Sequence, residues 1–369
     1  MSDDKKKVDF DSPAVQQEMD HIIHGTFVRQ GTMLAFPTGF PGSTIPILAD
    51  ESHITALDVS PQGFVYGGTS GKRAHVFVGM FHGVTGMIFD MKAVDDATHC
   101  PAVCCGKSRF VACVNGPSGT GRILASHLQP WPYDLIQEWG FRRPPFEDLG
   151  GVAGEPIVHA VADASRDHAV GVTAHHLFSV DLAAPKIQVI AEVPGCGRLA
   201  VGSKGSIIGP DGAGHLWRFD PQTQKLEPQA FKLPVGRWEK SPAVWARSAQ
   251  TGVLYTADDD GKLFSFDEQR GFSASLGKTM LAPVYCMAAT FDGRVFGSCG
   301  PGIAKMFCYD PARREITNLG VAVSLFERRR YGYVFGDAVT GRDGEIIFGE
   351  DDDGGHLWLY FPRIQAASA

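Results

Sequence analysis

Short apolar runs set the pattern of this chain, and long amphipathic stretches are rare. From about Thr26 onward these runs are separated by Gly, Pro, Asp and Asn. Runs of this kind, bounded by turn residues, predict β-strands. A clear example begins at His53-Ile-Thr-Ala-Leu-Asp-Val-Ser, turns at Pro61-Gln-Gly, and continues as Phe64-Val-Tyr-Gly-Gly. The pattern therefore predicts an all-β protein.

One phrase recurs along these runs, each time led by a basic or imidazole side chain. Its copies are His75-Val-Phe, Arg122-Ile-Leu, His176-Leu-Phe, His215-Leu-Trp, Lys262-Leu-Phe, Lys305-Met-Phe and His356-Leu-Trp. A repeat of roughly 40 residues with this content is typical of a radial array, in which one small sheet cannot bury both its faces alone. The repeat predicts a seven-bladed β-propeller over residues 26–363.

The last copy of the repeat ends soon after Tyr360, so its blade lacks an outer strand. We therefore expect the strand around Phe27 to Ala35 to supply the outer strand of that blade, since such closure removes exposed sheet edges. Residues 1–25 are charged and then mildly helical, with Ser12 or Asp11 as a cap before Pro13, and predict a short helical appendage. Residues from about 129 to 156 are rich in Pro and aromatics, and predict either a lid or a homo-oligomer contact.

The net charge and the hydropathy of the chain limit the kinds of partner that we expect it to bind. The net charge of -7 and the pI near 6.0 argue against nucleic acid, although a local basic ring can still attract anions. The chain shows neither the apolar core of a signal peptide nor a membrane-spanning run, which predicts a cytoplasmic protein without a membrane partner. Eight cysteines, several within apolar runs, predict free buried thiols.

The repeat also predicts where chemistry would gather. In a four-stranded blade, the innermost and third strands both begin at the same face of the disc. We therefore expect the seven phrase heads to ring one face together with the residues that head the inner strands: His53, His99, His159, Arg198, Trp245, Tyr285 and Tyr333. A funnel of His, Arg and aromatic side chains suits a small anionic, ring-bearing molecule.

Four of the phrase heads are histidines and form the predicted metal set: His75, His176, His215 and His356. Neutral imidazole is the commonest metal ligand, so we expect pairs in adjoining blades to bind manganese, zinc or magnesium. His159 and the acidic run 350–353 are further candidate ligands. The alternative interpretation stays open: each polar head closes a turn before a buried Leu-Trp or Leu-Phe pair.

Two loops that enter blades combine arginine with aromatic residues. Together with Arg198 they give the predicted substrate-binding set: Arg237, Trp238, Arg328, Arg329 and Arg330. Arginine binds carboxylate or phosphate through two bonds, and the aromatic rings offer stacking faces. Surface ion pairs are the alternative interpretation. His159, Tyr331 and Tyr333 are the predicted catalytic proton donors or acceptors.

The repeat resembles the seven-bladed propeller superfamily over most of the chain. Within it, Gly344-Glu-Ile-Ile-Phe-Gly leading to Gly355-His-Leu-Trp is similar to blade phrases of streptogramin lyases and cytoplasmic oligogalacturonate lyases. The resemblance implies a divalent metal on the propeller face and elimination next to a carboxylate or carbonyl. By position, it implies His215 and His356 as ligands.

These observations predict a metal-assisted lyase that acts on a small anionic cyclic or sugar-derived substrate by proton abstraction and elimination. A metal-dependent hydrolase that opens a lactone or cyclic ketone would use the same parts. The third interpretation is a non-enzymatic interaction module, in which the face is polar but chemically mixed.

Overall fold

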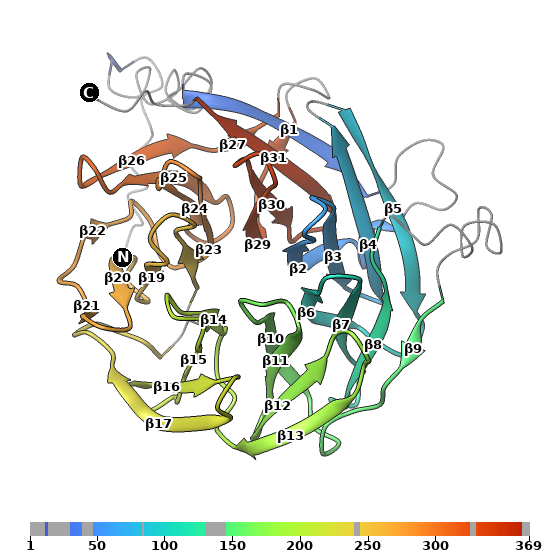
Figure 1. Cartoon of the computed structure of the whole chain (residues 1–369). Coiled ribbons are helices and arrows are strands. Elements are labelled where there is room, and N and C mark those ends of the chain that lie inside the picture. The colour runs from blue at the N-terminus through green and yellow to red at the C-terminus, as the bar shows by residue number, and fades with distance from the viewer. Residues whose placement is uncertain are drawn as a thin grey trace, which may run out of the picture.

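The computed structural model describes residues 12–13, 30–38, 47–82, 85–129, 145–239, 244–324 and 330–363. Seven small antiparallel sheets stand around a central axis, as Figure 1 shows. The chain is therefore an all-β, seven-bladed β-propeller, which confirms the architecture that the repeat predicts. A single 3-10 turn, η1 (Ala49–Glu51), precedes the first blade. The predicted appendage, apart from residues 12–13, lies outside the described residues.

The first three blades follow one another along the chain. Blade one consists of β2 (His53–Val59), β3 (Val65–Ser70), β4 (Ala74–His82) and β5 (Thr85–Val94). Blade two consists of β6 (His99–Cys105), β7 (Arg109–Asn115), β8 (Gly121–His127) and β9 (Glu147–Asp148). Blade three consists of β10 (Ile157–Ala162), β11 (His168–Thr173), β12 (His176–Asp181) and β13 (Ile187–Glu192).

The next three blades keep this order. Blade four consists of β14 (Ala200–Val201), β15 (Ile207–Pro210), β16 (His215–Asp220) and β17 (Lys225–Lys232). Blade five consists of β18 (Ala246–Arg247), β19 (Leu254–Ala257), β20 (Lys262–Asp267), β21 (Gly271–Phe272) and β22 (Gly277–Lys278). Blade six consists of β23 (Val284–Ala289), β24 (Val295–Cys299), β25 (Lys305–Asp310) and β26 (Glu315–Gly320).

Blade seven combines strands from the N-terminal and C-terminal parts of the chain. Its strands are β29 (Phe335–Thr340), β30 (Ile346–Glu350), β31 (His356–Pro362) and, on the outside, β1 (Gly31–Pro37), after the hairpin of β27 (Ala322–Val323) and β28 (Tyr331–Gly332). β1 pairs antiparallel with β31 from Gly31 opposite Pro362 to Pro37 opposite His356. The outermost strand of this blade therefore comes from the N-terminal part of the chain.

Antiparallel pairing gives the disc two distinct faces. In blade one, the first residue of the inner strand, His53, lies opposite Ser70 at the end of the second strand, and the third strand begins just beyond it. We call this side, where inner and third strands begin, the head face. The opposite side carries the turns from each inner strand to the second strand, and we call it the turn face.

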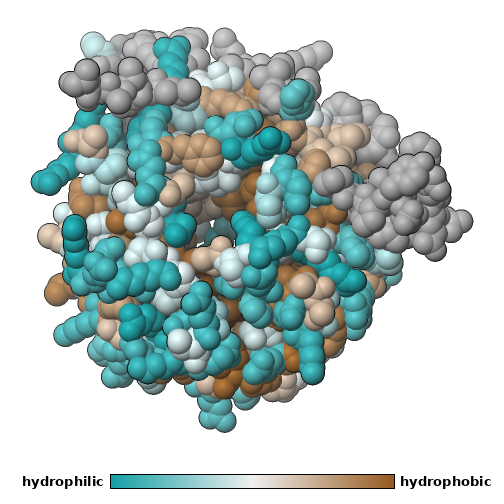
Figure 2. Space-filling model, in the orientation of Figure 1, coloured by the Kyte–Doolittle hydropathy of each residue, from teal (hydrophilic) through white to brown (hydrophobic). Residues whose placement is uncertain are grey.

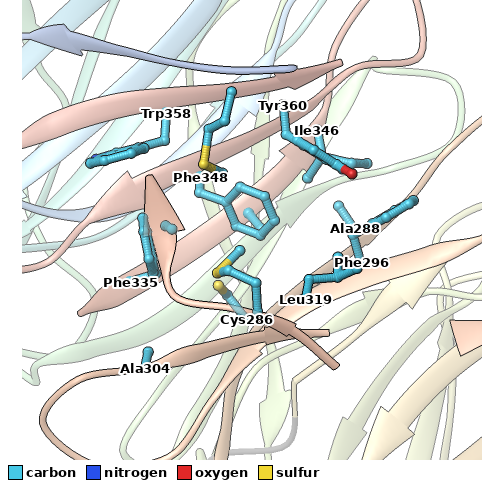
Figure 3. Close-up of a cluster of buried hydrophobic side chains, with 14 of the residues drawn as sticks. Cys286, Ala288, Phe296, Ala304, Leu319, Phe335, Ile346, Phe348, Trp358 and Tyr360 are labelled. Carbon is cyan, nitrogen blue, oxygen red and sulfur yellow. The ribbon is translucent and has the colours of Figure 1, made fainter. Parts of the chain in front are cut away.

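The recurring phrase builds the core between blades. In blade seven, Leu357 and Trp358 are both fully buried, yet they pack into different clusters. Trp358 joins Phe335, Phe348 and other side chains against blade six, as Figure 3 shows. Leu357 packs with residues of blade one, since successive side chains of a strand point to opposite faces. Each phrase therefore covers both faces of its sheet.

The remaining predictions about organisation have mixed outcomes. All eight cysteines are free and all but Cys196 are buried, which confirms that prediction. Residues 130–144 of the predicted insertion lie outside the described residues. In the described part of the chain, no helix combines the length and the apolar character that a membrane crossing requires.

Candidate functional site

The phrase heads on the head face are bound to carboxylates close by. Six of the seven heads lie within ion-pair distance of an acidic side chain: His75 of Glu51 and Asp90, Arg122 of Asp96 and Asp148, His176 of Glu155, His215 of Asp211, Lys262 of Asp258 and His356 of Glu350. Of these carboxylates, Asp90, Asp148 and Glu350 belong to strands, and the others belong to turns or to η1. Six heads are therefore each paired with a carboxylate close by.

The same acidic residues often close the turn that precedes the head. Asp211 accepts hydrogen bonds from the backbone N–H groups of Ala213, at 2.7 Å, and of His215, at 2.9 Å. Asp258 does the same for Asp260 and Lys262. Such side-chain bonds to nearby amides are a standard way to build a turn. This geometry favours the interpretation in which each head closes a turn before a buried apolar pair.

His75 is the most enclosed of these heads. Its Nε2 lies 2.9 Å from Glu51 and its Nδ1 lies 3.2 Å from Asp90, and all three side chains are buried. Burial alone would lower the pKa of His75, but the two carboxylates outweigh it and raise the pKa above 6.5. Arg73 binds Glu51 through two nitrogens and, as the largest cause, lowers the pKa of that carboxyl to about 2. The charges of Glu51, Asp90, Arg73 and His75 sum to zero when the imidazole of His75 is protonated.

The predicted metal ligands do not assemble into a centre in the described ranges, where no three His, Cys, Asp or Glu side chains are grouped to hold a metal ion. Each predicted imidazole lies beside one or two acidic side chains instead.

A pocket of about 390 Å³ lies at the centre of the ring and is the candidate site. Figure 2 shows a hollow at the centre of the face in view, with hydrophilic residues over most of that face. The pocket is lined by residues of the inner strands of six blades, all but blade six, and by the turn after β10. The lining includes Asp58, His159, Arg166, Arg198, Trp245, Arg247 and Asp337. Because it reaches that turn, it extends toward the turn face, away from most of the phrase heads.

Arg198 crosses the channel from blade four to blade seven. It donates to Asp337 Oδ1 at 2.5 Å and to the carbonyl oxygen of Gly336. Asp337 Oδ2 accepts in turn from the backbone N–H of Leu57 in blade one, at 2.8 Å. The predicted substrate-binding residue Arg198 thus lines the pocket, but much of its charge already serves to tie three blades together.

Arg166 marks a place where the repeat is broken. In the turn after the inner strand, five blades have a glycine two residues before the second strand, each with positive φ: Gly63, Gly205, Gly252, Gly293 and Gly344. Blade three has Arg166 there, with φ of 58°, a conformation that costs a non-glycine residue about 1 kcal/mol. Its guanidinium donates to Asp58 at 3.1 Å and to the Cys105 carbonyl at 2.7 Å. The strained arginine is held at the pocket by neighbouring blades.

His159 is the predicted catalytic residue that the fold brings into the pocket. Its Nδ1 accepts a hydrogen bond from the backbone N–H of Leu199 at 3.2 Å. Burial, helped by the charge of Arg198, lowers the pKa of His159 to about 3. The ring is therefore neutral near pH 7, with its proton on Nε2, and in this form it offers a hydrogen-bond donor. General-base catalysis would require a different tautomer.

Trp245 and Arg247 complete the pocket wall from blade five. The indole Nε1 of Trp245 donates to the Arg198 carbonyl at 3.0 Å, which fixes the ring at the wall. Arg247 is exposed and has no carboxylate partner among the residues that the structure describes. It is therefore the cation of this pocket whose charge is still available to a ligand.

The other predicted residues lie elsewhere. Arg237 binds Asp260, and the Trp238 indole binds the Pro234 carbonyl, so both side chains hold their own loop. Arg330 lies 3.4 Å from the buried Glu350. Tyr331 and Tyr333 are exposed near the start of blade seven, on the head face. Arg328 and Arg329 lie outside the described residues.

Four pocket residues were missed by reasoning from the sequence: Asp58, Arg166, Arg247 and Asp337. Three of them lie late in an inner strand or just after one, whereas the sequence argument considered the strand starts. The useful signal was an exception to the repeat: Arg166 replaces the glycine that five of the other six turns have.

Comparison with known proteins adds no relative. The sequence matches no protein-family model and no curated protein. The seven-bladed architecture and the geometry of the central pocket therefore carry the functional argument.

Proposed function

We propose that this propeller binds a small anionic, ring-bearing molecule in its central pocket. The observation that carries the proposal is the pocket of about 390 Å³ in which Arg247 lacks an ion-pair partner within the described ranges. This volume lies in the usual range for small-molecule sites, which are few and centrally placed in most folds. Trp245 offers an aromatic wall, and the Nε2–H of neutral His159 offers a donor to a carboxylate or carbonyl oxygen.

The charges of the other pocket arginines are largely balanced. Arg166 lies against Asp58, and Arg198 lies against Asp337. They contribute remaining N–H donors rather than net charge, since a guanidinium has five. Arg247 should therefore dominate the preference for an anion, and the ring preference should depend on Trp245.

A binding experiment with matched probes tests this proposal. Calorimetric titration should detect benzoate and should detect benzamide, its uncharged analogue, at least tenfold more weakly. Arg247→Ala should weaken benzoate binding about tenfold or more, since a hydrogen bond to a charged group contributes about 1.5–3 kcal/mol. Arg313→Ala, at an exposed arginine of blade six, is the control. Equal binding of the two probes, or an unchanged Arg247→Ala variant, would contradict the proposal.

Catalysis at this pocket, as elimination or as ring-opening hydrolysis, stays a prediction. The pocket carboxylates Asp58 and Asp337 are held by arginine and by backbone N–H groups, so neither is an obvious base. Binding of a metal ion likewise stays a prediction, and no step is assigned to one here. Elemental analysis, with thermal shifts upon adding manganese, zinc or magnesium, tests the metal prediction. Bound metal would favour the lyase or hydrolase, and absence of any benzoate binding would favour an interaction module.

We also propose that β1 acts as the closing strand of the ring. It pairs with β31 along its whole length, and Met33, Leu34 and Ala35 are buried. Removal of residues 1–38 should expose the edge of β31 and lead to aggregation, measured by light scattering. A truncated chain that stays monomeric with an unchanged melting temperature would contradict this role.

A further inference from the structure

A second cavity lies beside the central pocket. It has a volume of about 320 Å³ and is formed on the turn face by turns of blades three, four and five. Asp163 and Ala164, the first residues after β10, line both cavities. Ala164 is exposed and small, so a ligand seated in the central pocket can extend over this residue. The two cavities therefore adjoin at this turn, and together they could take an elongated ligand that runs from the axis toward the rim.

The second cavity is built around a buried carboxylate. Glu268 belongs to the turn after β20 and is 7% exposed, yet it reaches the turn of blade four. Its oxygens accept from the Lys204 backbone N–H at 2.9 Å and from Ser206 Oγ at 2.5 Å. Both donors are uncharged, so the negative charge of Glu268 has no ion-pair partner in the part of the chain described. Its oxygens keep lone pairs for a further donor.

The other charges of this cavity leave an acidic balance. Arg218 and Lys225 both pair with Glu227. Asp220 accepts hydrogen bonds from Gln222 and Thr223, and Asp163 accepts from its own turn. The exposed Lys204 is the remaining cation of the lining, which also includes the carboxylates of Asp163, Asp220 and Glu268. The second cavity therefore favours a cation near Glu268, whereas the central pocket offers Arg247 to an anion, and Asp163 lies where the two cavities adjoin.

We infer that the ligand of this elongated site is the C-terminal end of a linear peptide, with its carboxylate in the central pocket and a basic side chain beside Glu268. The inference rests on the proposed anion binding in the central pocket and extends it. A peptide end supplies the required combination: a carboxylate, a side-chain ring for Trp245, and a cationic group one or more residues away. Each extended residue spans at most about 3.3–3.6 Å, so the spacing of the basic residue is set by the distance between the cavities.

The test compares acetylated peptides that end in Phe with a free carboxylate and carry either Arg or Gln two, three or four residues from the end. At one of these spacings, calorimetry should show the Arg peptide binding at least tenfold more tightly than its Gln counterpart. Glu268→Gln keeps the shape and hydrogen-bonding capacity of the side chain but removes its charge. It should abolish the advantage of Arg while leaving the Gln peptide and benzoate unaffected.

The outcomes separate the two proposals. If benzoate binds but Arg and Gln peptides bind equally at every spacing, the peptide inference is wrong and the anion pocket stands. If Glu268→Gln leaves the Arg advantage intact, the inference is also wrong. If neither benzoate nor any peptide binds, both proposals fail. A melting temperature of Glu268→Gln close to that of the parent chain is required for the comparison, and Glu227→Gln serves as the matched variant at a paired carboxylate of the same cavity.

Discussion

The two faces of the disc use similar side chains for different purposes. On the head face, basic groups recur at one position of each blade, and six of the seven lie beside carboxylates of nearby turns. In the central pocket, which extends toward the turn face, the charged residues do not recur from blade to blade. Arg166 even replaces a repeated glycine at the expense of a left-handed backbone. In this repeat protein, the regular positions serve the fold, and the exceptions form the candidate site.

The difference has an electrostatic reason. A repeated position must be stable in every blade. Six of the seven basic heads are accordingly matched by a local acid, and these six leave little charge to attract a ligand. A ligand site requires charge that the fold itself does not neutralise. Arg247 meets that requirement in the central pocket. Recurrence of a polar residue is therefore a poor guide to function unless its local partners are known.

The largest expected effect is on the head face. His75→Ala leaves Glu51 and Asp90 buried without the imidazolium between them, although Arg73 still neutralises part of the charge. Breaking a buried charge pair typically costs about 3–5 kcal/mol, so urea unfolding should show a loss of that order. Benzoate affinity of the folded fraction should be unchanged. A loss of affinity at unchanged stability would reverse the roles assigned to the two faces.

Arg166→Gly should change stability little and weaken anion binding, which is the opposite of what we expect for His75→Ala. Glycine removes the cost of the left-handed backbone, about 1 kcal/mol, which offsets part of the lost interaction with Asp58. We expect stability to change by no more than about 1 kcal/mol, while anion binding falls several-fold because the pocket loses its N–H donors. Chemical denaturation and calorimetry on the same samples check both parts. Gly205→Arg, the converse change in blade four, should be clearly destabilising, and a neutral result there would weaken the argument.

The contributions of His75, on the head face, and of His159, in the central pocket, should change with pH in opposite directions. The pKa of His75 is raised above 6.5, so its contribution is fully present below pH 6.5 and is lost as the pH rises through its folded pKa. The pKa of His159 is lowered to about 3, so stability is lost as the pH falls from 6.5 toward 3. His75→Gln should flatten the alkaline limb, and His159→Gln should flatten part of the acid limb, in urea titrations at each pH. If His75→Gln changed the acid limb and His159→Gln changed the alkaline limb, the environments described for the two histidines would be wrong.

The smallest effect is expected at a partly exposed head. His215 lies 3.5 Å from Asp211, and its side chain is 32% exposed. Partly exposed pairs contribute little, so His215→Gln should cost less than about 1 kcal/mol in the free energy of unfolding. Asp211→Ala should cost more, because Asp211 also accepts two backbone hydrogen bonds of its turn. Equal costs would indicate that the ion pair, rather than the turn, is the function of this position.

The predictions from the sequence agree best with the structure where the repeat is strict. Leu357 and Trp358 predict a strand buried on both faces, and the structure places them in two separate cores. The heads were predicted to share one face, and pairing between strands explains why they do so. The sequence did not indicate that Glu51 neutralises His75, because Glu51 lies 24 positions before His75 in the chain. For the same reason, the ion pair of Arg198 with Asp337, 139 positions away, could not be foreseen.

The sequence by itself determined the number of blades, the all-β class and the buried phrases, because these depend on local periodicity and recur along the chain. Tertiary structure decided which charges remain available, since a guanidinium such as Arg198 is neutralised by a carboxylate that only ring formation brings across the channel. It also placed the pocket so that it extends toward the turn face, and there it brings Arg166 of blade three together with Trp245 and Arg247 of blade five. Periodicity encodes the architecture, whereas a binding site depends on long-range contacts between residues that no local pattern connects.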